Sequence, residues 1–244
     1  MNADIDLAYA VQSELIARRI AAGARVVGRK IGLTNPKVQA QLGVDRPDFG
    51  VLLEDMQVLE GEPVDITRLL QPKIEAEIAF ILKADLDQAG AISEVDVAAA
   101  TGYVLAALEI VDSRVAGWDI SILDTVADNG SSAMFALGDQ LVGLDGLDLV
   151  STAMTMTRNG EHVSDGTGAD CLGNPLTAVA WLATAARDYG APLRAGEVIL
   201  SGALGPMVPV APGSSFTADI VGLGTVTATF TDTATLTHAG VTHE

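Results

Sequence analysis

The sequence predicts an α+β protein built as a single domain, and three observations support this prediction. Residues 4–21 carry apolar side chains at helical spacing. Residues 71–82 combine β-branched and aromatic side chains between a proline and a polar run, which is typical of a strand. The C-terminal part of the chain alternates between apolar and polar residues, as further strands do. Because no repeat, linker or break in composition interrupts residues 1–244, we expect one domain, with a short helical segment at about 4–22 and a β-rich core at about 26–232.

The N-terminal part is expected to form a helix, a strand and a second short helix. The first helix ends at residues 21–23, where a glycine follows two alanines. Residues 26–34 form a short apolar strand that carries Lys30. Residues 35–36, an Asn-Pro pair, open the second helix, which continues to about Leu42. Lys30 is either held in a confined site that lowers its pKa or is an ordinary solvated lysine, and both interpretations stay open at this point.

The middle of the chain is expected to contain loops around a few regular elements. Residues 43–50 are rich in Gly, Pro and Asp and predict a loop, whereas residues 51–70 predict a strand and a connection with a turn at 60–63. Ser93 is placed to cap a helix over the alanines that follow it. Residues 125–132 are small and polar, which suits either the rim of a site or an ordinary turn.

The C-terminal part predicts a hairpin, a helix and three further strands. Residues 159–160 are Asn-Gly, a strong signal for a two-residue hairpin turn. An Asn-Pro pair at 174–175 precedes a helix at 176–189. Residues 197–202 have the apolar character of a buried strand, and residues 216–230 predict two strands around a Gly-Leu-Gly turn.

The composition limits the classes of function. The chain has 244 residues, of which 49% are hydrophobic, enough to bury a sizeable core. Its formal net charge of -18 and the lack of a basic patch disfavour nucleic-acid binding. No apolar run is long enough to span a membrane, and no secretion signal opens the chain. The single cysteine, Cys171, excludes an internal disulfide and suits a reducing compartment, so we expect a cytoplasmic protein.

Several common active-site types find no support in the sequence. The histidines His162, His238 and His243 are scattered, which disfavours a catalytic triad or a multi-histidine metal site. The Gly-Leu-Gly at 222–224 lacks the third glycine and the helix of a dinucleotide fingerprint, and no phosphate loop is present. Nucleotide-dependent redox chemistry and phosphoryl transfer are therefore not expected.

Two carboxylates share one face of the strand predicted at 71–82. Side chains alternate along a strand, so Glu75 and Glu77 point the same way, with Lys73 beside them. Neighbouring carboxylates repel one another, and burial strengthens the repulsion. A divalent metal ion held by oxygen ligands would relieve it. The alternative is a strand with one solvated charged face, and this stretch alone does not decide between them.

A third carboxylate lies within the apolar run at residues 103–111. Glu109 is costly to bury there unless it is paired, protonated or bound to a metal. Together with Glu75 and Glu77 it makes a plausible three-carboxylate site, and ligation by oxygen alone favours Mg or Mn over Zn or Cu. The alternative is a salt bridge from Glu109 to Arg114 or Lys73.

Seven stretches match the motifs of one known family. They are GRKIGLT at 28–34, QLGVDRPDFG at 41–50, QPKIEAEI at 71–78, ALEIVDSR at 107–114, DTVADN at 124–129, CLGNPL at 171–176 and SGALGPM at 201–207. The match runs from about residue 5 to about residue 230, which is nearly the whole chain. In these stretches the chain resembles the hydratase and decarboxylase branch of the fumarylacetoacetate hydrolase superfamily.

The resemblance implies a fold, a metal and an assembly. The fold is a mixed β-roll or β-sandwich core with flanking helices. The metal is Mg or Mn, held by Glu75, Glu77 and Glu109. Family members form cyclic homo-oligomers, so the resemblance implies a pentamer or a decamer, with possible association with a downstream aldolase or a sister decarboxylase.

The resemblance also implies roles for individual residues. Lys30 and Asp48 become an acid/base pair, and Ser131 and Gly205 fall at substrate-binding positions. The loop that carries Ser131 departs slightly from the family pattern, because Gly130 stands where relatives often have alanine.

The activity implied by the resemblance is metal-dependent addition of water to 2-hydroxypenta-2,4-dienoate, giving 4-hydroxy-2-oxopentanoate in the meta-cleavage catabolism of aromatic compounds. Residues 71–77 and 35–39 resemble the hydratase subgroup, since decarboxylases of the branch tend to have Glu-Pro-Glu. The alternatives are a 2-oxo-3-hexenedioate (4-oxalocrotonate) decarboxylase and a non-catalytic partner subunit. Hydrolysis of acylpyruvates would need a His–Glu pair, and the N-terminal half contains no histidine.

Overall fold

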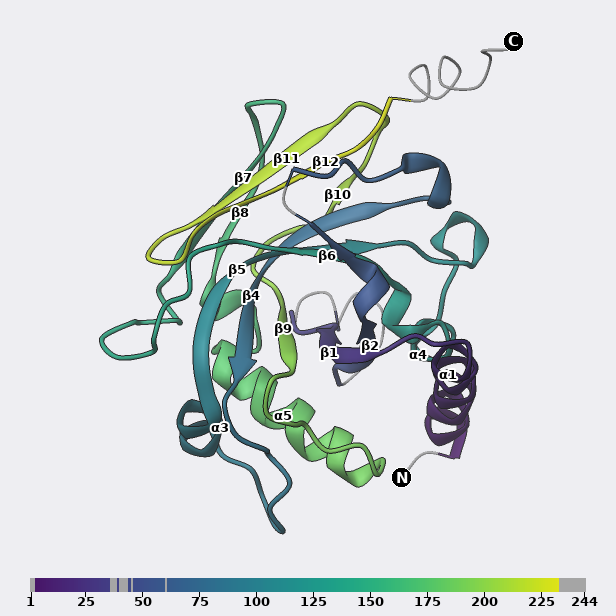
Figure 1. The fold of residues 1–244 in the computed structure, drawn as a ribbon, viewed down its shortest axis with the longest axis vertical. Coiled ribbons are helices and arrows are strands. Elements are labelled where there is room, and N and C mark those ends of the chain that lie inside the picture. Colours follow the sequence, from purple (N-terminus) through teal and green to yellow (C-terminus); the bar gives the residue numbers. More distant parts are fainter. Residues whose placement is uncertain (1–2, 36–38, 40–43, 45, 60, 233–244) are drawn as a thin grey trace.

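Two β-sheets form most of the structure, a computed structural model that describes residues 3–35, 39, 44, 46–59 and 61–232 (Figure 1). The larger sheet contains β1 (Val26–Gly32), β2 (Asp48–Leu53), β3 (Gln57–Val58), β4 (Lys73–Leu82), β5 (Thr101–Val111), β6 (Ser132–Leu137), β9 (Val198–Ala203) and β10 (Val208–Pro209). The smaller sheet contains β7 (Ala153–Arg158), β8 (Glu161–Thr167), β11 (Ser215–Ile220) and β12 (Gly224–Thr229). The helices are α1 (Ala3–Ala21), α3 (Glu94–Ala100), α4 (Ile122–Ala127) and α5 (Pro175–Asp188).

The larger sheet is mixed and curls around an interior. Its strand order is β2-β1-β9-β4-β5-β6-β3, with β10 added beside β4. β1 pairs with β9 in parallel, and β4 pairs with β5 antiparallel. Although β9 and β4 separate β1 from β5 in this order, Lys30 of β1 reaches Glu109 of β5. The sheet therefore closes on itself, which confirms the predicted mixed β-roll with flanking helices.

The two faces of the curled sheet bury different residues. Ile74, Ile78 and Phe80 of β4 belong to the main hydrophobic core. The alternate positions of β4 carry Glu75 and Glu77 toward the interior of the roll. On that face the apolar residues form a separate, smaller cluster that contains Ala79, Leu105, Ala107 and Leu200. The interior of the roll thus combines buried acids with an apolar lining.

Helices α1, α3 and α5 begin within one residue of the predicted positions, whereas α4 was not predicted. The Ser93 side chain accepts a hydrogen bond from the Asp96 backbone N–H and caps α3, and Asn174 caps α5 in the same way through Leu176. Helix α1 lies beside α4 (Figure 1). The buried amide of Gln12 in α1 donates to the carbonyl oxygens of Phe49 and Val126. Helix α1 is thereby fastened to β2 and α4, the two elements that flank the candidate site.

The predicted hairpin is confirmed. Strands β7 and β8 pair through a turn at Asn159 and Gly160, with φ values of 52° and 85°. Both central residues of such a turn need a positive φ, which asparagine and glycine tolerate best. The strands predicted at 216–230 are β11 and β12 of the same smaller sheet.

Two loop predictions need correction. Residues 48–50 were expected in a loop but begin β2, because Asp48, Phe49 and Gly50 pair with Gly32, Ile31 and Lys30 of β1. Pairing with a distant strand thus overrides the local loop composition. Residues 125–127 of the predicted polar loop form the end of α4. The helix predicted from residue 35 to about 42 lies largely outside the described residues.

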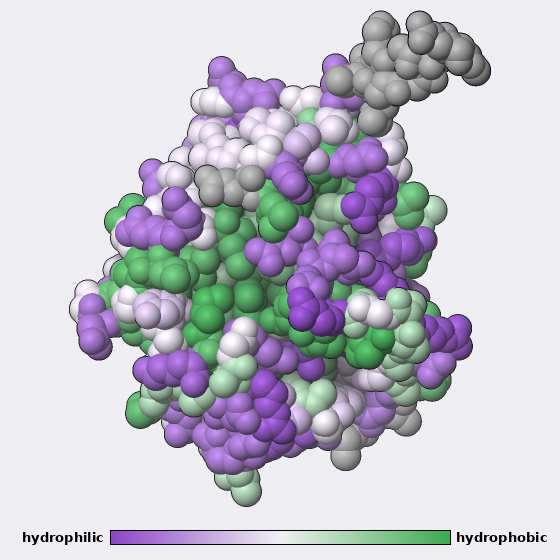
Figure 2. Space-filling model, in the orientation of Figure 1, coloured by the Kyte–Doolittle hydropathy of each residue, from purple (hydrophilic) through white to green (hydrophobic). Residues whose placement is uncertain are grey.

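The surface in the same view carries apolar residues near the middle of the face, bordered by hydrophilic ones (Figure 2). No helix within the described parts of the chain is long and apolar enough to cross a membrane.

Candidate metal and acid–base site

The three predicted carboxylates meet inside the roll. The antiparallel pairing of β4 with β5 places Glu75 directly opposite Glu109. Glu77 follows on the same face of β4. One carboxylate oxygen from each residue lies within 4.8 Å of the others. Glu75 is 6% exposed, whereas Glu77 and Glu109 are fully buried. The alternative of a solvated charged face is therefore wrong, and the three carboxylates form the cluster that the sequence suggests.

The carboxylate oxygens in this cluster have few hydrogen-bond partners. Among the described residues, Glu77 Oε1 and both oxygens of Glu109 lack a hydrogen-bond partner, and Glu109 Oε2 has only an ion pair with Lys30. Glu77 Oε2 accepts one bond, from the Gly202 backbone N–H at 2.7 Å. Buried polar atoms are rarely left unpaired, because each costs free energy. Three convergent oxygen donors with free lone pairs fit a hard divalent cation.

The raised pKa values of the three glutamates also favour a bound cation in the cluster. Burial and the adjacent Glu109 carboxylate raise the pKa of Glu75 to about 7, although Lys30 opposes the shift. Burial, with Glu109 and Glu75 as neighbours, raises the pKa of Glu77 well above its usual value. Burial also raises the pKa of Glu109, against the lowering effect of Lys30. A bound cation would favour the ionised form of all three groups.

Lys30 is the cation that the structure places against this cluster. Its Nζ lies 3.3 Å from Glu109 Oε2, and its side chain is almost completely buried. Burial lowers the pKa of Lys30, but Glu109, Asp48 and the other two carboxylates outweigh that effect and raise it overall. The interpretation of a solvated lysine is therefore wrong, and so is the expected fall in pKa.

Asp48 lies beside Lys30 at the start of β2. It pairs with Gly32 of β1, and a Cβ at Gly32 would meet Asp48 Oδ1 at 2.0 Å and Lys30 Nζ at 3.2 Å. Only glycine leaves room for both groups there. Asp48 is 1% exposed, and its Oδ1 has no hydrogen-bond partner among the described residues. Burial raises the pKa of Asp48, while Lys30 lowers it. The pair is thus enclosed together, away from solvent.

Ser131 lies in a short turn that follows α4. The turn, a 3₁₀ helix at Asn129–Ser131, leads directly into β6. Ser131 is buried, and its Oγ lies 3.2 Å from Thr125 Oγ1. Gly130 packs against Lys30, since a Cβ at Gly130 would meet Lys30 Cε at 3.0 Å. The polar loop, for which the sequence left a site rim and an ordinary turn open, therefore adjoins Lys30.

Gly205 occupies a different environment. A Cβ at this position would meet Asp165 O at 2.6 Å and Met154 Cε at 2.8 Å, so Gly205 packs against β7 and β8 of the smaller sheet. The described contacts join Lys30, Asp48 and the three glutamates but do not bring Gly205 among them. Its role in substrate binding stays a prediction.

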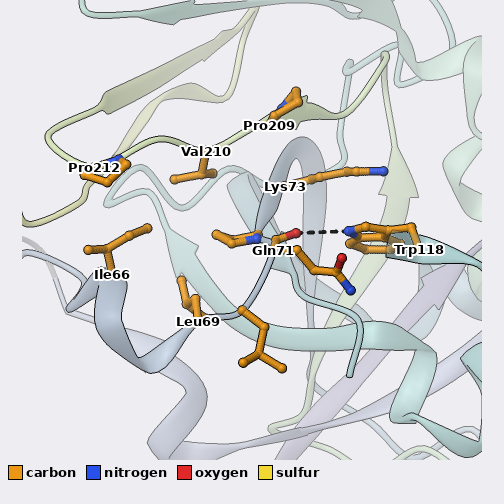
Figure 3. A pocket seen from close by; sticks show the side chains of 10 residues that line it. Ile66, Leu69, Gln71, Lys73, Trp118, Pro209, Val210 and Pro212 are labelled. Carbon is orange, nitrogen blue, oxygen red and sulfur yellow. Dashed lines mark hydrogen bonds between the residues drawn. The ribbon is translucent and has the colours of Figure 1, made fainter. Parts of the chain in front are cut away.

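The alternative partners of Glu109 are engaged elsewhere. Arg114 pairs with Asp128. The Nζ of Lys73 lies 4.1 Å from the ring centre of Trp118, at a surface pocket of about 430 Å³ shown in Figure 3. The lining of that pocket includes none of the seven predicted site residues. The salt-bridge interpretation named the wrong partners, because Glu109 faces Lys30.

Sequence reasoning missed several residues that support the site. Thr125 lies beside Ser131, and the Gly202 N–H binds Glu77. Gly202 has a φ of 106°, and a Cβ there would meet Thr34 Oγ1 at 2.3 Å, so the position requires glycine. A glycine at the end of a predicted buried strand was the available signal for a close backbone approach.

Comparisons with known proteins agree on one family. The family model described as fumarylacetoacetate (FAA) hydrolase C-terminal matches residues 23–231. The chain is 54% identical over 229 residues to a 2-keto-4-pentenoate hydratase of Burkholderia vietnamiensis, covering 94% of this chain and 87% of that protein. It is 45% identical over 230 residues to a 2-hydroxyhexa-2,4-dienoate hydratase of Comamonas testosteroni, with 93% and 87% covered.

Solved structures extend this similarity. The 4-oxalocrotonate decarboxylase from Pseudomonas putida G7, complexed with magnesium and adipate, matches with a TM-score of 0.89 and 41% identity. The match covers 93% of this chain and 86% of that one. A fumarylpyruvate hydrolase from Pseudomonas aeruginosa, in complex with Mn²⁺ and pyruvate, is 13% identical with a TM-score of 0.62, which is a likeness of fold alone.

Proposed function

The chain belongs to the fumarylacetoacetate hydrolase family, and from this premise we propose that it is a metal-dependent hydratase. Its substrate is 2-hydroxypenta-2,4-dienoate and its product 4-hydroxy-2-oxopentanoate, a step in the meta-cleavage catabolism of aromatic compounds. The observation that carries the proposal is the enclosed group of three carboxylates with Lys30 at 3.3 Å from Glu109. A relative named 2-keto-4-pentenoate hydratase is 54% identical to this chain over 229 aligned residues, which supports the same reaction.

The metal in this proposal is Mg²⁺ or Mn²⁺. Glu75, Glu77 and Glu109 would hold it, because their buried oxygens converge and largely lack other partners. When bound, the ion would supply Lewis-acid stabilisation of negative charge on the oxygens of a 2-oxo acid.

The residues of the chain itself account for the proton transfers. Hydration first requires protonation of the dienol at C5, with loss of the C2 hydroxyl proton, to give an unsaturated ketone. Water then adds at C4, and the resulting enolate takes a proton at C3. Lys30 and Asp48 are enclosed side by side, so one can hold a proton as an ammonium group while the other accepts one as a carboxylate. Ser131 offers a hydroxyl that can bind the substrate, and Gly205 is the second substrate-binding position in this proposal.

The assembly and location follow the family expectation in this proposal. The chain works as a homo-oligomer, a pentamer or a decamer, in the cytoplasm, on a small 2-hydroxydienoic acid. Association with a downstream aldolase or a sister decarboxylase remains part of the proposal.

The test is the ultraviolet absorbance of freshly generated 2-hydroxypenta-2,4-dienoate, followed with purified protein in the presence and absence of Mg²⁺ or Mn²⁺. We expect metal-dependent loss of the dienol signal, with 4-hydroxy-2-oxopentanoate as product. A decarboxylase is the second candidate, because the structure of 4-oxalocrotonate decarboxylase matches with a TM-score of 0.89. Release of CO₂ from 2-oxo-3-hexenedioate, without dienol loss, would transfer the assignment to that reaction. Inactivity in both assays would favour a non-catalytic partner subunit.

A further inference from the structure

The turn that carries Ser131 has an uncommon backbone conformation. Asn129, Gly130 and Ser131 have φ values of 57°, 63° and 53°. Positive φ is easy for glycine and tolerated by asparagine, but it is unfavourable for serine. Consecutive residues in this region persist only where the surrounding structure holds them. The contacts of the turn therefore decide whether Ser131 stays in its observed position.

The side chain of Asn129 attaches the turn to β2. The Val51 backbone N–H donates to Asn129 Oδ1 at 2.7 Å, and Asn129 Nδ2 donates to the Val51 carbonyl oxygen at 2.9 Å. Strand β2 ends the strand order of the larger sheet. The Asn129 amide thus takes the place that a neighbouring strand would take at this edge. It forms hydrogen bonds with both the N–H and the carbonyl oxygen of Val51.

The turn and β2 are also in close steric contact. A Cβ at Gly50 would meet the Asn129 carbonyl oxygen at 2.3 Å. Asp48 lies two residues before Gly50 in the same strand, and Lys30 faces Gly50 in β1. On the other side of the turn, Gly130 packs against the Lys30 side chain. The turn, Asp48 and Lys30 are therefore joined by one continuous set of contacts.

The flanks of the turn are fastened independently. The Arg114 guanidinium pairs with the Asp128 carboxylate and donates to the carbonyl oxygens of Asp112 and Ser132. The Asp112 N–H in turn donates to the Ser131 carbonyl oxygen at 2.8 Å. These contacts hold the ends of the turn in place when the Asn129 side chain is altered. A change at Asn129 should therefore disturb the local geometry without unfolding the loop.

We propose that Asn129 is a positioning residue, whose amide clamps the left-handed turn onto β2 and so fixes Ser131 relative to Lys30 and Asp48. The inference rests on the proposed hydratase function, since it assigns the clamp to the same site. Asn129 touches none of the three metal-binding carboxylates in the described contacts. Loss of the clamp therefore affects turnover and leaves metal binding intact.

The test compares Asn129→Gly with a matched control, Asn159→Gly. Asn159 also has a positive φ, 52°, and its Oδ1 accepts a hydrogen bond from the Ser215 N–H at 2.8 Å, in the hairpin of the smaller sheet. Both substitutions relieve the same backbone strain and remove an amide clamp. We expect Asn129→Gly to lower kcat by about tenfold or more, with Mn²⁺ affinity within about twofold of the unaltered chain. Asn159→Gly should leave both quantities unchanged.

A second variant separates the two halves of the clamp. Asn129→Asp keeps the size of the side chain and the acceptor for Val51 N–H, but it replaces the donor with an oxygen that faces the Val51 carbonyl. We expect a loss of kcat in this variant as well. Unaltered kcat in a folded Asn129→Gly or Asn129→Asp, or an equal loss in Asn159→Gly, would overturn the proposal. If Asn129→Gly does not fold, Asn129→Asp alone decides.

Amide hydrogen exchange tests the Asn129 clamp independently of the proposed reaction. We expect faster amide exchange in residues 128–132 and at Val51 for Asn129→Gly, and no change in these segments for Asn159→Gly. If the unaltered chain lacks hydratase activity, the proposed function fails, and exchange alone then decides whether the clamp exists. Unchanged exchange in that segment would refute the clamp whatever the reaction.

Discussion

At the scale of single residues, Lys30 gives the most direct test of the proposed mechanism. It is enclosed among four carboxylates, of which Glu109 and Asp48 have the largest effects in raising its pKa. We expect Lys30→Ala to lower kcat by at least about hundredfold while KM changes by less than about threefold, because the ammonium group moves protons rather than holding the substrate. Steady-state kinetics of dienol loss measures both quantities.

The control for Lys30 is Lys83→Ala, which removes an exposed lysine just after β4. Its kinetics should match those of the unaltered chain. Full turnover in Lys30→Ala would remove Lys30 from the mechanism.

A second prediction at this scale concerns Glu75. Replacing it by glutamine keeps the shape of the side chain but removes one of three converging charges. We expect Mn²⁺ affinity to fall by about tenfold or more, as measured by calorimetric titration. Glu94→Gln, which alters an exposed glutamate at the start of α3, serves as the control and should bind Mn²⁺ normally. Affinity unchanged by Glu75→Gln would remove Glu75 from the ligand set.

The residues of the site differ in how far the sequence could predict them. Glu75 and Glu77 were recognisable because a strand has a period of two, and Glu109 because a carboxylate inside an apolar run needs a partner. The partner itself could not be predicted from the chain alone. Lys30 meets Glu109 only because the sheet curls, and curvature depends on contacts between strands far apart in sequence.

At the scale of elements, the approach of β9 to β1 depends on Gly28. A Cβ at this position would meet the Val198 carbonyl oxygen at 1.8 Å, where only backbone atoms are present to move. We expect Gly28→Ala to lower the free energy of unfolding by about 3 kcal/mol, because the two strands cannot keep their parallel pairing. Urea unfolding followed by circular dichroism measures the loss.

The matched control is Gly143→Ala, since a Cβ there would have no heavy atom within 4 Å. It should change the free energy of unfolding by less than about 0.5 kcal/mol. Equal free energies of unfolding for the two variants would show that β1 and β9 can move apart at Gly28 with little loss of stability.

Element predictions succeeded where local chemistry decides the structure. The Asn159-Gly160 hairpin, the cap at Ser93 and the helix after the Asn-Pro pair at 174–175 depend on neighbouring residues only, and all three are confirmed. The start of β2 was missed because Pro47 and Gly50 suggest a loop, whereas pairing with β1 makes a strand. Long-range pairing leaves little local trace in the sequence.

At the scale of the whole molecule, metal binding should be linked to stability and to pH. The pKa of Glu75 is raised to about 7, so protons compete with a cation for the site as the pH falls. A carboxyl group with a raised pKa destabilises the folded chain as the pH rises through that value, and a bound cation offsets this loss. We expect the increase in Tm caused by Mn²⁺ to grow between about pH 5 and about pH 8.

Thermal unfolding with Mn²⁺ and with a chelator, at each pH, measures this increase. Glu75→Gln should flatten the pH dependence, which identifies the titrating group. An increase in Tm that is the same at every pH would contradict the link.

The position of β9 has a consequence for the synthesis of the protein. The strand is formed by residues 198–203, late in the chain, yet it lies between β1 and β4, which are made much earlier. While the ribosome is still adding residues, β1 and β4 have open edges toward each other, and such edges favour aggregation. The roll closes only when this late strand emerges and inserts. A nascent chain thus carries all three glutamates before it can enclose them, and a chain stopped short of residue 198 would expose acids that the finished molecule conceals.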